Sequence, residues 1–154
     1  MLLVALAFAI VGLRPGQVSG FSMTPRIDED EYVLINALAY RISAPRRGDI
    51  VAFKHERSAP SVYLKRIIGV PGDRVRIDHG TVWINGRRLT EPYVRFHDER
   101  SAPETVVPRD AYYVLGDNRR NSDDSRAWGT VPAADLIGRA VVGVWPLDHV
   151  GLLR

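Results

Sequence analysis

The sequence contains no cysteine among its 154 residues. A disulfide scaffold, cysteine-ligated zinc, an iron–sulfur cluster and thiol catalysis are therefore excluded. A strong charge of either sign is also lacking, because 21 Lys and Arg residues oppose 18 Asp and Glu residues and leave a net charge of +3. The charges are interspersed along the chain, so this mild excess does not argue for a nucleic-acid partner.

Long apolar runs are scarce as well. Residues 1–13 are uncharged, but as a helix they would extend only about 20 Å, against roughly 30 Å of hydrocarbon in a bilayer. The run lacks the basic flank and the A-x-A site of a cleavable signal peptide. Residues 1–13 are therefore interpreted either as a short membrane anchor or as a buried apolar N-terminal helix. Either interpretation leaves residues 14–154 as one domain of ordinary size.

Turn-forming residues are abundant, with 13 glycines and 10 prolines. Apolar runs between these turns predict short strands. The expected strands are residues 32–35, 49–53, 61–70, 74–78, 81–85, 112–115 and 139–145.

The turns themselves also carry predictions. His79-Gly80 predicts a hairpin turn, and Asn85-Gly86 a second turn. Residues 86–110 are expected to form a loop or a strand pair at a sheet edge, and residues 132–136 one helical turn. Because helices and strands do not alternate, the predicted fold class is mainly β, with strongly bent antiparallel sheets around one core.

A serine follows the apolar segment in the pattern G-x-S-M-x-P at residues 20–25. Pro25 restricts the residue before it, so Ser22 lies in a constrained, extended turn. Taken alone, the pattern favours a structural serine that bonds to the backbone of its own turn.

A lysine opens the pattern K-R-I-I-G-x-P-G-D at residues 65–73. In a strand, Lys65 shares a face with Tyr63 and Ile67, whereas Arg66 points the other way. Lys65 either extends its amine to solvent along this apolar face or is desolvated. Desolvation would lower its pKa and leave a neutral amine at pH 7.

Residues 116–129 form the densest polar pattern, G-D-N-R-x-N-S-x-D-S-R-x-W-G. A loop that needed only solubility would not need two glycines and a tryptophan around such a run. The histidines, at positions 55, 79, 97 and 149, all lie outside these patterns.

With R-G-D-I-V-x-F at residues 47–53, these patterns resemble in content and order the bacterial type I signal peptidase (leader peptidase) family of membrane-bound serine proteases. The resemblance extends from about residue 20 to residue 146. The pattern at 116–129 is long and specific, whereas the others are individually modest. Lys65, where a histidine would suggest the endoplasmic-reticulum branch, is typical of the bacterial and organellar branch.

The resemblance implies a Ser–Lys variant of the catalytic triad, with Ser22 as nucleophile and Lys65 as general base. It also implies that the Ser122 hydroxyl orients the lysine amine. Two supporting charge pairs are implied, Asp124 with Arg126 and Asp117 with Arg66.

The implied activity is removal of N-terminal signal peptides from exported precursors, by an endopeptidase held to the outer face of the cell membrane by a single-pass anchor. The expected partners are signal peptides and membrane lipid, with no cofactor, no metal and a monomeric chain. The peptide would add as an extended strand beside residues 17–20 and 62–65. Its binding pockets are expected to be formed by Gly20, Phe21, Met23, Val62, Tyr63 and Leu64.

Two departures from the family pattern stand out. Many members carry a serine two residues before the nucleophile, whose hydroxyl helps to form the oxyanion hole, but this chain has Gly20. The hole is then expected to depend mainly on the Ser22 N–H. The usual Pro-Thr-Leu is replaced by Pro25-Arg26-Ile27, which should alter packing and not chemistry.

Two alternatives remain at this point. One is a pilus- or conjugation-type maturation peptidase with the same dyad. The other is a catalytically silent β module that binds exported peptides at a membrane. A self-cleaving repressor is disfavoured, because no room for a DNA-binding helical domain precedes Ser22.

Overall fold

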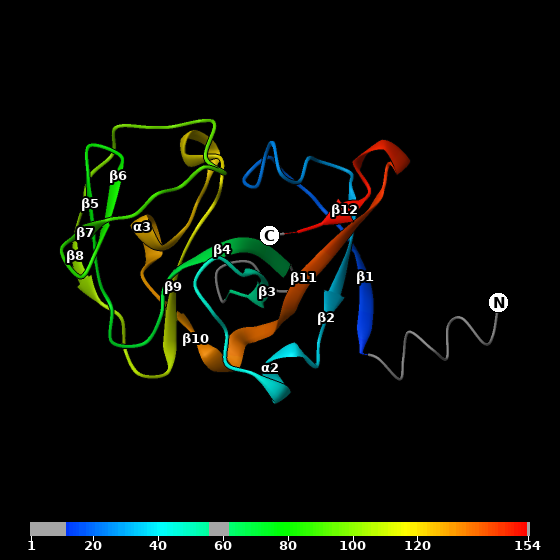
Figure 1. The fold of residues 1–154 in the computed structure, drawn as a ribbon, viewed down its shortest axis with the longest axis horizontal. Coiled ribbons are helices and arrows are strands. Elements are labelled where there is room, and N and C mark those ends of the chain that lie inside the picture. The colour runs from blue at the N-terminus through cyan, green and yellow to red at the C-terminus, as the bar shows by residue number, and fades with distance from the viewer. Residues whose placement is uncertain (1–11, 56–61, 154) are drawn as a thin grey trace.

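A computed structural model describes residues 12–55 and 62–153, and strands dominate it (Figure 1). In chain order the elements are β1 (Leu13–Gln17), β2 (Tyr32–Asn36), α2 (Ala39–Ile42), β3 (Ile50–Lys54), β4 (Val62–Gly69), β5 (Arg74–Asp78), β6 (Thr81–Ile84), β7 (Arg87–Arg88), β8 (Ala102–Val106), β9 (Ala111–Leu115), η2 (Arg119–Asn121), α3 (Ser125–Trp128), β10 (Val131–Pro132), η3 (Ala133–Asp135), β11 (Leu136–Trp145), η4 (Leu147–His149) and β12 (Gly151–Leu152).

The expected N-terminal helix falls mostly on residues 1–11, which lie outside the described residues. Leu13, the last residue of that segment, is the first residue of β1. Within residues 12–55 and 62–153, no helix is both long enough and apolar enough to cross a membrane.

The larger sheet has the strand order β1-β2-β11-β3-β4-β9-β10, with β12 paired to β11. Neighbouring strands pair antiparallel. The ten-residue β11 joins the two halves of the sheet, pairing with β3 near its start and with β2 along the rest. Its register shifts at three places, and such bulges bend a strand and increase its twist. The prediction of a strongly bent antiparallel sheet is thereby confirmed.

The smaller sheet has the order β7-β6-β5-β8 and is built from two tight turns. Both turn pairs, His79-Gly80 and Asn85-Gly86, have positive φ at each residue, as the hairpin turns that suit twisted strands require. Both predicted turns are confirmed. The strand-pair interpretation of residues 86–110 is wrong, because β7 and β8 occupy opposite edges of the sheet. β8 pairs instead with β5, about 30 residues earlier in the chain, and no local pattern reports such a partner.

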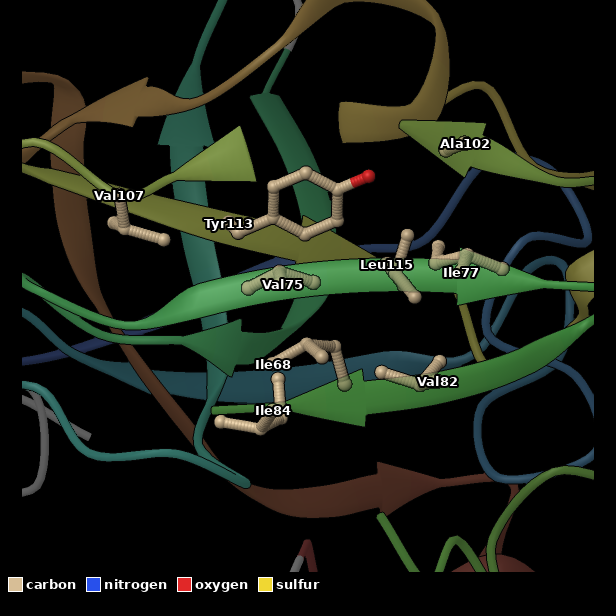
Figure 2. Close-up of a cluster of buried hydrophobic side chains, with 9 residues drawn as sticks. All are labelled: Ile68, Val75, Ile77, Val82, Ile84, Ala102, Val107, Tyr113 and Leu115. Atoms are coloured by element: carbon tan, nitrogen blue, oxygen red, sulfur yellow. The ribbon is translucent and has the colours of Figure 1, made fainter. Parts of the chain in front are cut away.

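The apolar faces of the two sheets pack against each other. Figure 2 shows Val75 and Ile77 of β5 beside Tyr113 and Leu115 of β9, with Ile68 of β4 in the same cluster. A second cluster lies beneath the segment between β1 and β2 and contains Met23 and Ile27. This second cluster supports the loop that carries the predicted nucleophile.

Candidate active site

Ser22 lies on an irregular segment, residues 18–31, which we call the nucleophile loop. The loop turns back on itself through hydrogen bonds that Arg26 N–H and Ile27 N–H both donate to the Met23 carbonyl, at 3.0 Å. The side chains of Met23 and Ile27 are fully buried, so the loop is held to the core on both sides of its turn. Phe21, in contrast, is 48% exposed. The buried side chains of Met23 and Ile27 thus support the part of the loop that carries Ser22.

Lys65 lies on β4, opposite Val51 of β3. Its amine Nζ lies 2.7 Å from Ser22 Oγ, although 42 residues separate the two in the chain. The lysine is only 2% exposed. Strand alternation puts Tyr63 on the same face, and the Tyr63 ring centroid lies 5.3 Å from Nζ. The two residues predicted to act as nucleophile and base are therefore in direct hydrogen-bonding contact.

Burial has a direct electrostatic effect on this amine. It lowers the pKa of Lys65 to about 8, despite the opposing influence of the Asp124 and Asp123 carboxylates. A substantial fraction of the side chain is consequently neutral in mildly alkaline solution. A neutral amine at hydrogen-bond distance can accept the hydroxyl proton of a serine.

The neighbouring residue, Arg66, points to the opposite face of β4 and meets Asp117. Two parallel hydrogen bonds join them, Nε to Oδ1 at 2.8 Å and Nη2 to Oδ2 at 2.6 Å, with both side chains 1% exposed. Arg66 also donates to the Gly48 carbonyl and lies over the Tyr93 ring. Burial raises the pKa of Asp117, and Arg66 counters that effect. The pair joins β4 to the loop after β9.

Asp124 and Arg126 form a second two-pronged pair, with both hydrogen bonds at 2.7 Å. Asp124 also accepts from the Gly116 N–H at 3.1 Å and from the Arg126 N–H at the start of α3. Burial alone would raise the pKa of Asp124, but Arg126 holds it below its usual value. An ionised Asp124 therefore fixes the polar loop 116–129 against the end of β9.

The role expected of Ser122, orienting the lysine amine, stays a prediction. The Ser122 Oγ is buried and makes no well-formed hydrogen bond within the described parts of the chain, but it lies close enough to Asp124 to help lower the pKa of that carboxyl. The hydroxyl packs beside Gly116, where an added Cβ would come within 2.3 Å of Ser122 Oγ and 2.5 Å of the Ser22 carbonyl oxygen. Gly116 thus permits the close approach of the nucleophile loop to the polar loop.

Asn118 is a contact that the sequence analysis missed. Its N–H donates to the Ser22 carbonyl at 3.0 Å, and its side-chain amide donates to the Phe21 carbonyl at 3.1 Å. Asn118 therefore fixes the backbone on which Ser22 is carried. Its place inside the G-D-N-R pattern was the signal. Glu91 and Asp98, which pair with Arg119 and Arg126, gave no such signal because they lie in an irregular segment.

A groove of about 760 Å³ runs up to Ser22 and Lys65. All six residues predicted to bind substrate line it: Gly20, Phe21, Met23, Val62, Tyr63 and Leu64. β1 pairs only with β2 in the described sheet, and residues 62–65 of β4 pair only with β3. Both strands therefore contribute a free backbone edge to the walls of the groove. The charged groups Arg14, Lys54 and Asp123 also line it.

The chain is similar to known proteins in both fold and sequence. The fold is similar to the crystal structure of a signal peptidase I from Enterococcus faecalis V583, with a TM-score of 0.54 and 35% sequence identity over 63% of this chain and 97% of that one. A "Probable signal peptidase I-2" of Synechocystis sp. is 42% identical over 137 residues, and a "Signal peptidase I" of Leptolyngbya laminosa is 39% identical over 139 residues.

The matches cover 86% of this chain in both cases, but only 63% of the Synechocystis protein and 68% of the Leptolyngbya protein. The chain thus spans about two thirds of the length of these relatives. A family model for "Signal peptidase, peptidase S26" matches residues 1–145, which is nearly the whole sequence. The chain belongs to the signal peptidase family, peptidase S26.

Proposed function

We propose that this chain is a serine endopeptidase that removes N-terminal signal peptides from exported precursor proteins, with Ser22 as nucleophile and Lys65 as general base. The observation that carries the proposal is the 2.7 Å contact between Lys65 Nζ and Ser22 Oγ at the end of an open groove. The family relationship supports the same substrate class. Both reacting groups belong to one chain, so a monomer suffices.

The chemistry follows from the protonation state of the lysine. The neutral amine accepts the Ser22 hydroxyl proton as Oγ attacks the scissile carbonyl, and the resulting ammonium then protonates the leaving amine. Water, deprotonated by the same amine, hydrolyses the acyl-enzyme and regenerates the serine. Desolvation of Lys65 by β4 and its neighbours makes the neutral form accessible.

The oxyanion of the tetrahedral intermediate requires hydrogen-bond donors that are already in position. Gly20 supplies no hydroxyl, so we assign this role mainly to the Ser22 N–H. The Asn118 hydrogen bonds to the Phe21 and Ser22 carbonyls support that assignment, because they orient the peptide units on either side of the nucleophile.

The substrate is proposed to bind as an extended strand between β1 and β4. The two free edges offer backbone donors and acceptors to both sides of one peptide, as in β-strand addition. Successive side chains of such a peptide alternate, so those one and three residues before the cut face the enzyme together.

The walls of the groove predict specificity for small residues. A charged side chain placed against the walls formed by Met23, Val62, Tyr63 and Leu64 would be desolvated among apolar groups. We expect cleavage after Ala, with Gly or Ser tolerated, and a small or modest aliphatic residue three positions earlier. A peptide series varied at the residue before the cut tests this expectation, and efficient cleavage after Lys, Arg or Phe would refute the pocket assignment.

We also propose that residues 1–13 anchor the chain in the cell membrane and that the β domain lies on the outer face. Exposed apolar side chains support this placement: Tyr32, Trp145, Leu147, Val150 and Leu152, which we call the apolar rim. Tyr32 pairs with Gln17 of β1 on one side and with Trp145 of β11 on the other, so the rim begins beside the groove. A rim of this kind suits the bilayer surface, where signal segments emerge.

The deciding experiment is incubation of the purified full chain with a secretory precursor. Wild type should release the signal peptide, and Ser22→Ala and Lys65→Ala should each lose about a thousandfold or more in rate, because the two groups act as one unit. Ser43→Ala, on the exposed end of α2, is the matched control and should retain activity. A silent peptide-binding module would show no cleavage by wild type, and a pilus-type peptidase would cleave only its own class of substrate.

A further inference from the structure

The nucleophile loop contains hydrogen-bonded turns but no strand or helix. It is closed at its base by the Val18 N–H, which donates to the Glu31 carbonyl at 2.8 Å, and by the Asp30 N–H, which donates to the Val18 carbonyl at 3.0 Å. Between these bonds the backbone follows turns and not a strand ladder. The position of Ser22 therefore depends on what packs against the loop.

The C-terminal residues 146–153 lie against this loop at three points. The Arg26 guanidinium donates to the Leu152 carbonyl, and the His149 imidazole Nδ1 hydrogen-bonds to the Glu31 carboxylate. Leu153 packs on the same buried cluster as Met23 and Ile27. β12 pairs with β11, which fixes this end of the chain to the central strand of the larger sheet.

We propose that residues 146–153 form a C-terminal strap that holds the nucleophile loop in its reactive position, with His149 and Arg26 as positioning residues. The inference rests on the proposed function, because it assigns these contacts a role in serine attack. Neither residue touches the reacting atoms. Their effect is transmitted through Glu31 at the base of the loop and through the Met23–Ile27 turn.

The burial of Glu31 makes its pairing with His149 consequential. Its side chain is 6% exposed, whereas that of His149 is 47% exposed. A buried carboxylate without a partner is costly, so the strap and the loop base are linked through this charge. The other charged groups that face His149 are Asp28 and Asp148, and both are acidic. All three carboxylates favour the protonated imidazole.

The sign of the pH dependence follows. The hydrogen bond that the imidazole donates to Glu31, with the charges of Glu31, Asp148 and Asp28, raises the pKa of His149 above its usual value of 6.5. A raised pKa means that the charged pair is fully present below the unfolded value and is lost as pH rises through the folded value. The strap should thus contribute most in mildly acidic solution and least in alkaline solution.

The test compares His149→Asn with a matched control, His79→Asn, which removes an exposed histidine lying 3.9 Å from Asp78 in the smaller sheet. Asparagine tolerates the positive φ of residue 79. His149→Asn should lower kcat on the order of tenfold at pH 6, with KM nearly unchanged, because small displacements of a nucleophile are costly. At pH 9.5 the loss should fall to about threefold or less. Protonation of Lys65 cancels in the ratio of wild-type to variant rates at each pH.

A second readout does not depend on catalysis. Hydrogen exchange at the Val18 and Asp30 amides, which close the loop base, should accelerate in His149→Asn and stay unchanged in His79→Asn. The conservative variant Glu31→Gln should reproduce the effect, and the double variant Glu31→Gln/His149→Asn should lose no more than either single variant, since both act through one contact.

The outcomes separate the two proposals. If wild type cleaves no precursor, the proposed function fails, and amide exchange alone decides whether the strap holds the loop. A His149→Asn chain with wild-type kcat at pH 6, an equal loss at both pH values, additive losses in the double variant, or unchanged exchange at Val18 and Asp30 would each overturn the strap.

Discussion

Two adjacent basic side chains on β4 lie in different electrostatic environments. Lys65 and Arg66 are both almost fully buried, but they point to opposite faces of the sheet. Among residues 12–55 and 62–153, no carboxylate lies in hydrogen-bonding contact with Lys65, whose amine lies against the Ser22 hydroxyl and the Tyr63 ring. Arg66 meets Asp117 through two hydrogen bonds and remains charged. The Lys65 amine can thus lose its proton near pH 8, whereas the Arg66 guanidinium stays paired with Asp117.

The pH profile of peptide cleavage tests the first of these environments. Because only the neutral amine accepts a proton, kcat/KM should rise through a single inflection near the Lys65 pKa of about 8 and level off above it. Asp123 raises the pKa of Lys65, so Asp123→Asn should move the inflection to lower pH. Asp110→Asn, an exposed carboxylate outside the groove, is the control and should leave the profile in place. A profile insensitive to Asp123→Asn would contradict this electrostatic account.

The Arg66–Asp117 pair makes a prediction about stability. Asp117→Ala leaves a fully buried guanidinium without its counter-charge, which typically costs about 3–5 kcal/mol in the free energy of unfolding. Chemical denaturation should report this loss. The matched control is Glu104→Ala, which breaks the exposed pair with Arg74 and should cost no more than about 1 kcal/mol. Equal losses in the two variants would mean that the buried pair contributes no more to the free energy of unfolding than the exposed pair.

Among the elements, the active site depends on the contact between two loops. The nucleophile loop and the polar loop 116–129 meet at Gly116, Asn118 and Ser122. The polar loop is held by Asp124, which caps α3, and by Ser125, whose hydroxyl accepts from the Val114 N–H of β9 at 2.9 Å. A short helix and a buried strand thereby position a loop that contacts the nucleophile.

Gly116→Ala should disturb this contact. The new Cβ would lie 2.5 Å from the Ser22 carbonyl oxygen, so the backbone must move, at about 1–3 kcal/mol in stability. A shift of about 1 Å at Ser22 should lower kcat on the order of a hundredfold. Gly72→Ala is the control, because φ there is +87° but a Cβ meets nothing within 4 Å. Gly72→Ala should lower the free energy of unfolding by a similar amount through backbone strain but should retain kcat. If kcat fell equally in both variants, the effect of Gly116→Ala would be a general loss of stability and not a displacement of Ser22.

Local sequence patterns predicted the elements that are specified by turn residues or by strand alternation. The two hairpin turns were readable from His79-Gly80 and Asn85-Gly86, and strand alternation separated Lys65 from Arg66 correctly. β1 was missed because Pro15 and Gly16 interrupt its apolar pattern, and it exists through pairing with β2. The family pattern pointed to Ser122, but its packing beside Gly116 depends on how two distant loops approach, which no spacing encodes.

At the scale of the whole molecule, the apolar rim groups five of the exposed apolar side chains of the described residues. The apolar rim begins at the end of the larger sheet that also carries the nucleophile loop, since Gln17, Tyr32 and Trp145 are register neighbours. Phe21, beside the nucleophile, is exposed as well. The smaller sheet, with its exposed arginines at β7, extends from the other end of the molecule (Figure 1). The apolar rim therefore belongs to the larger sheet and the segment that follows β11, whereas the arginines of β7 belong to the smaller sheet.

Membrane association is therefore predicted for the full chain. It should stay with membranes after carbonate extraction, because residues 1–13 are apolar throughout. Phe8→Lys places a charge within that run, which costs roughly 2.5–3.5 kcal/mol at a bilayer centre and should release most of the protein. Ile42→Lys, a change of the same kind at an exposed site on α2, should leave the protein membrane-bound. Release of wild type by carbonate would favour a buried N-terminal helix instead.

The free edge of β1 has a consequence for how the chain behaves at high concentration. An unpaired strand edge that can accept a substrate can also accept the same edge of another molecule, which is the usual origin of sheet-to-sheet aggregation. β1 contains Pro15, which has no N–H to donate, and the charged Arg14. Proline and charge are the residues that natural sheets use to discourage such pairing. The strand that is proposed to receive the peptide thus also carries the residues that protect its own edge against self-association.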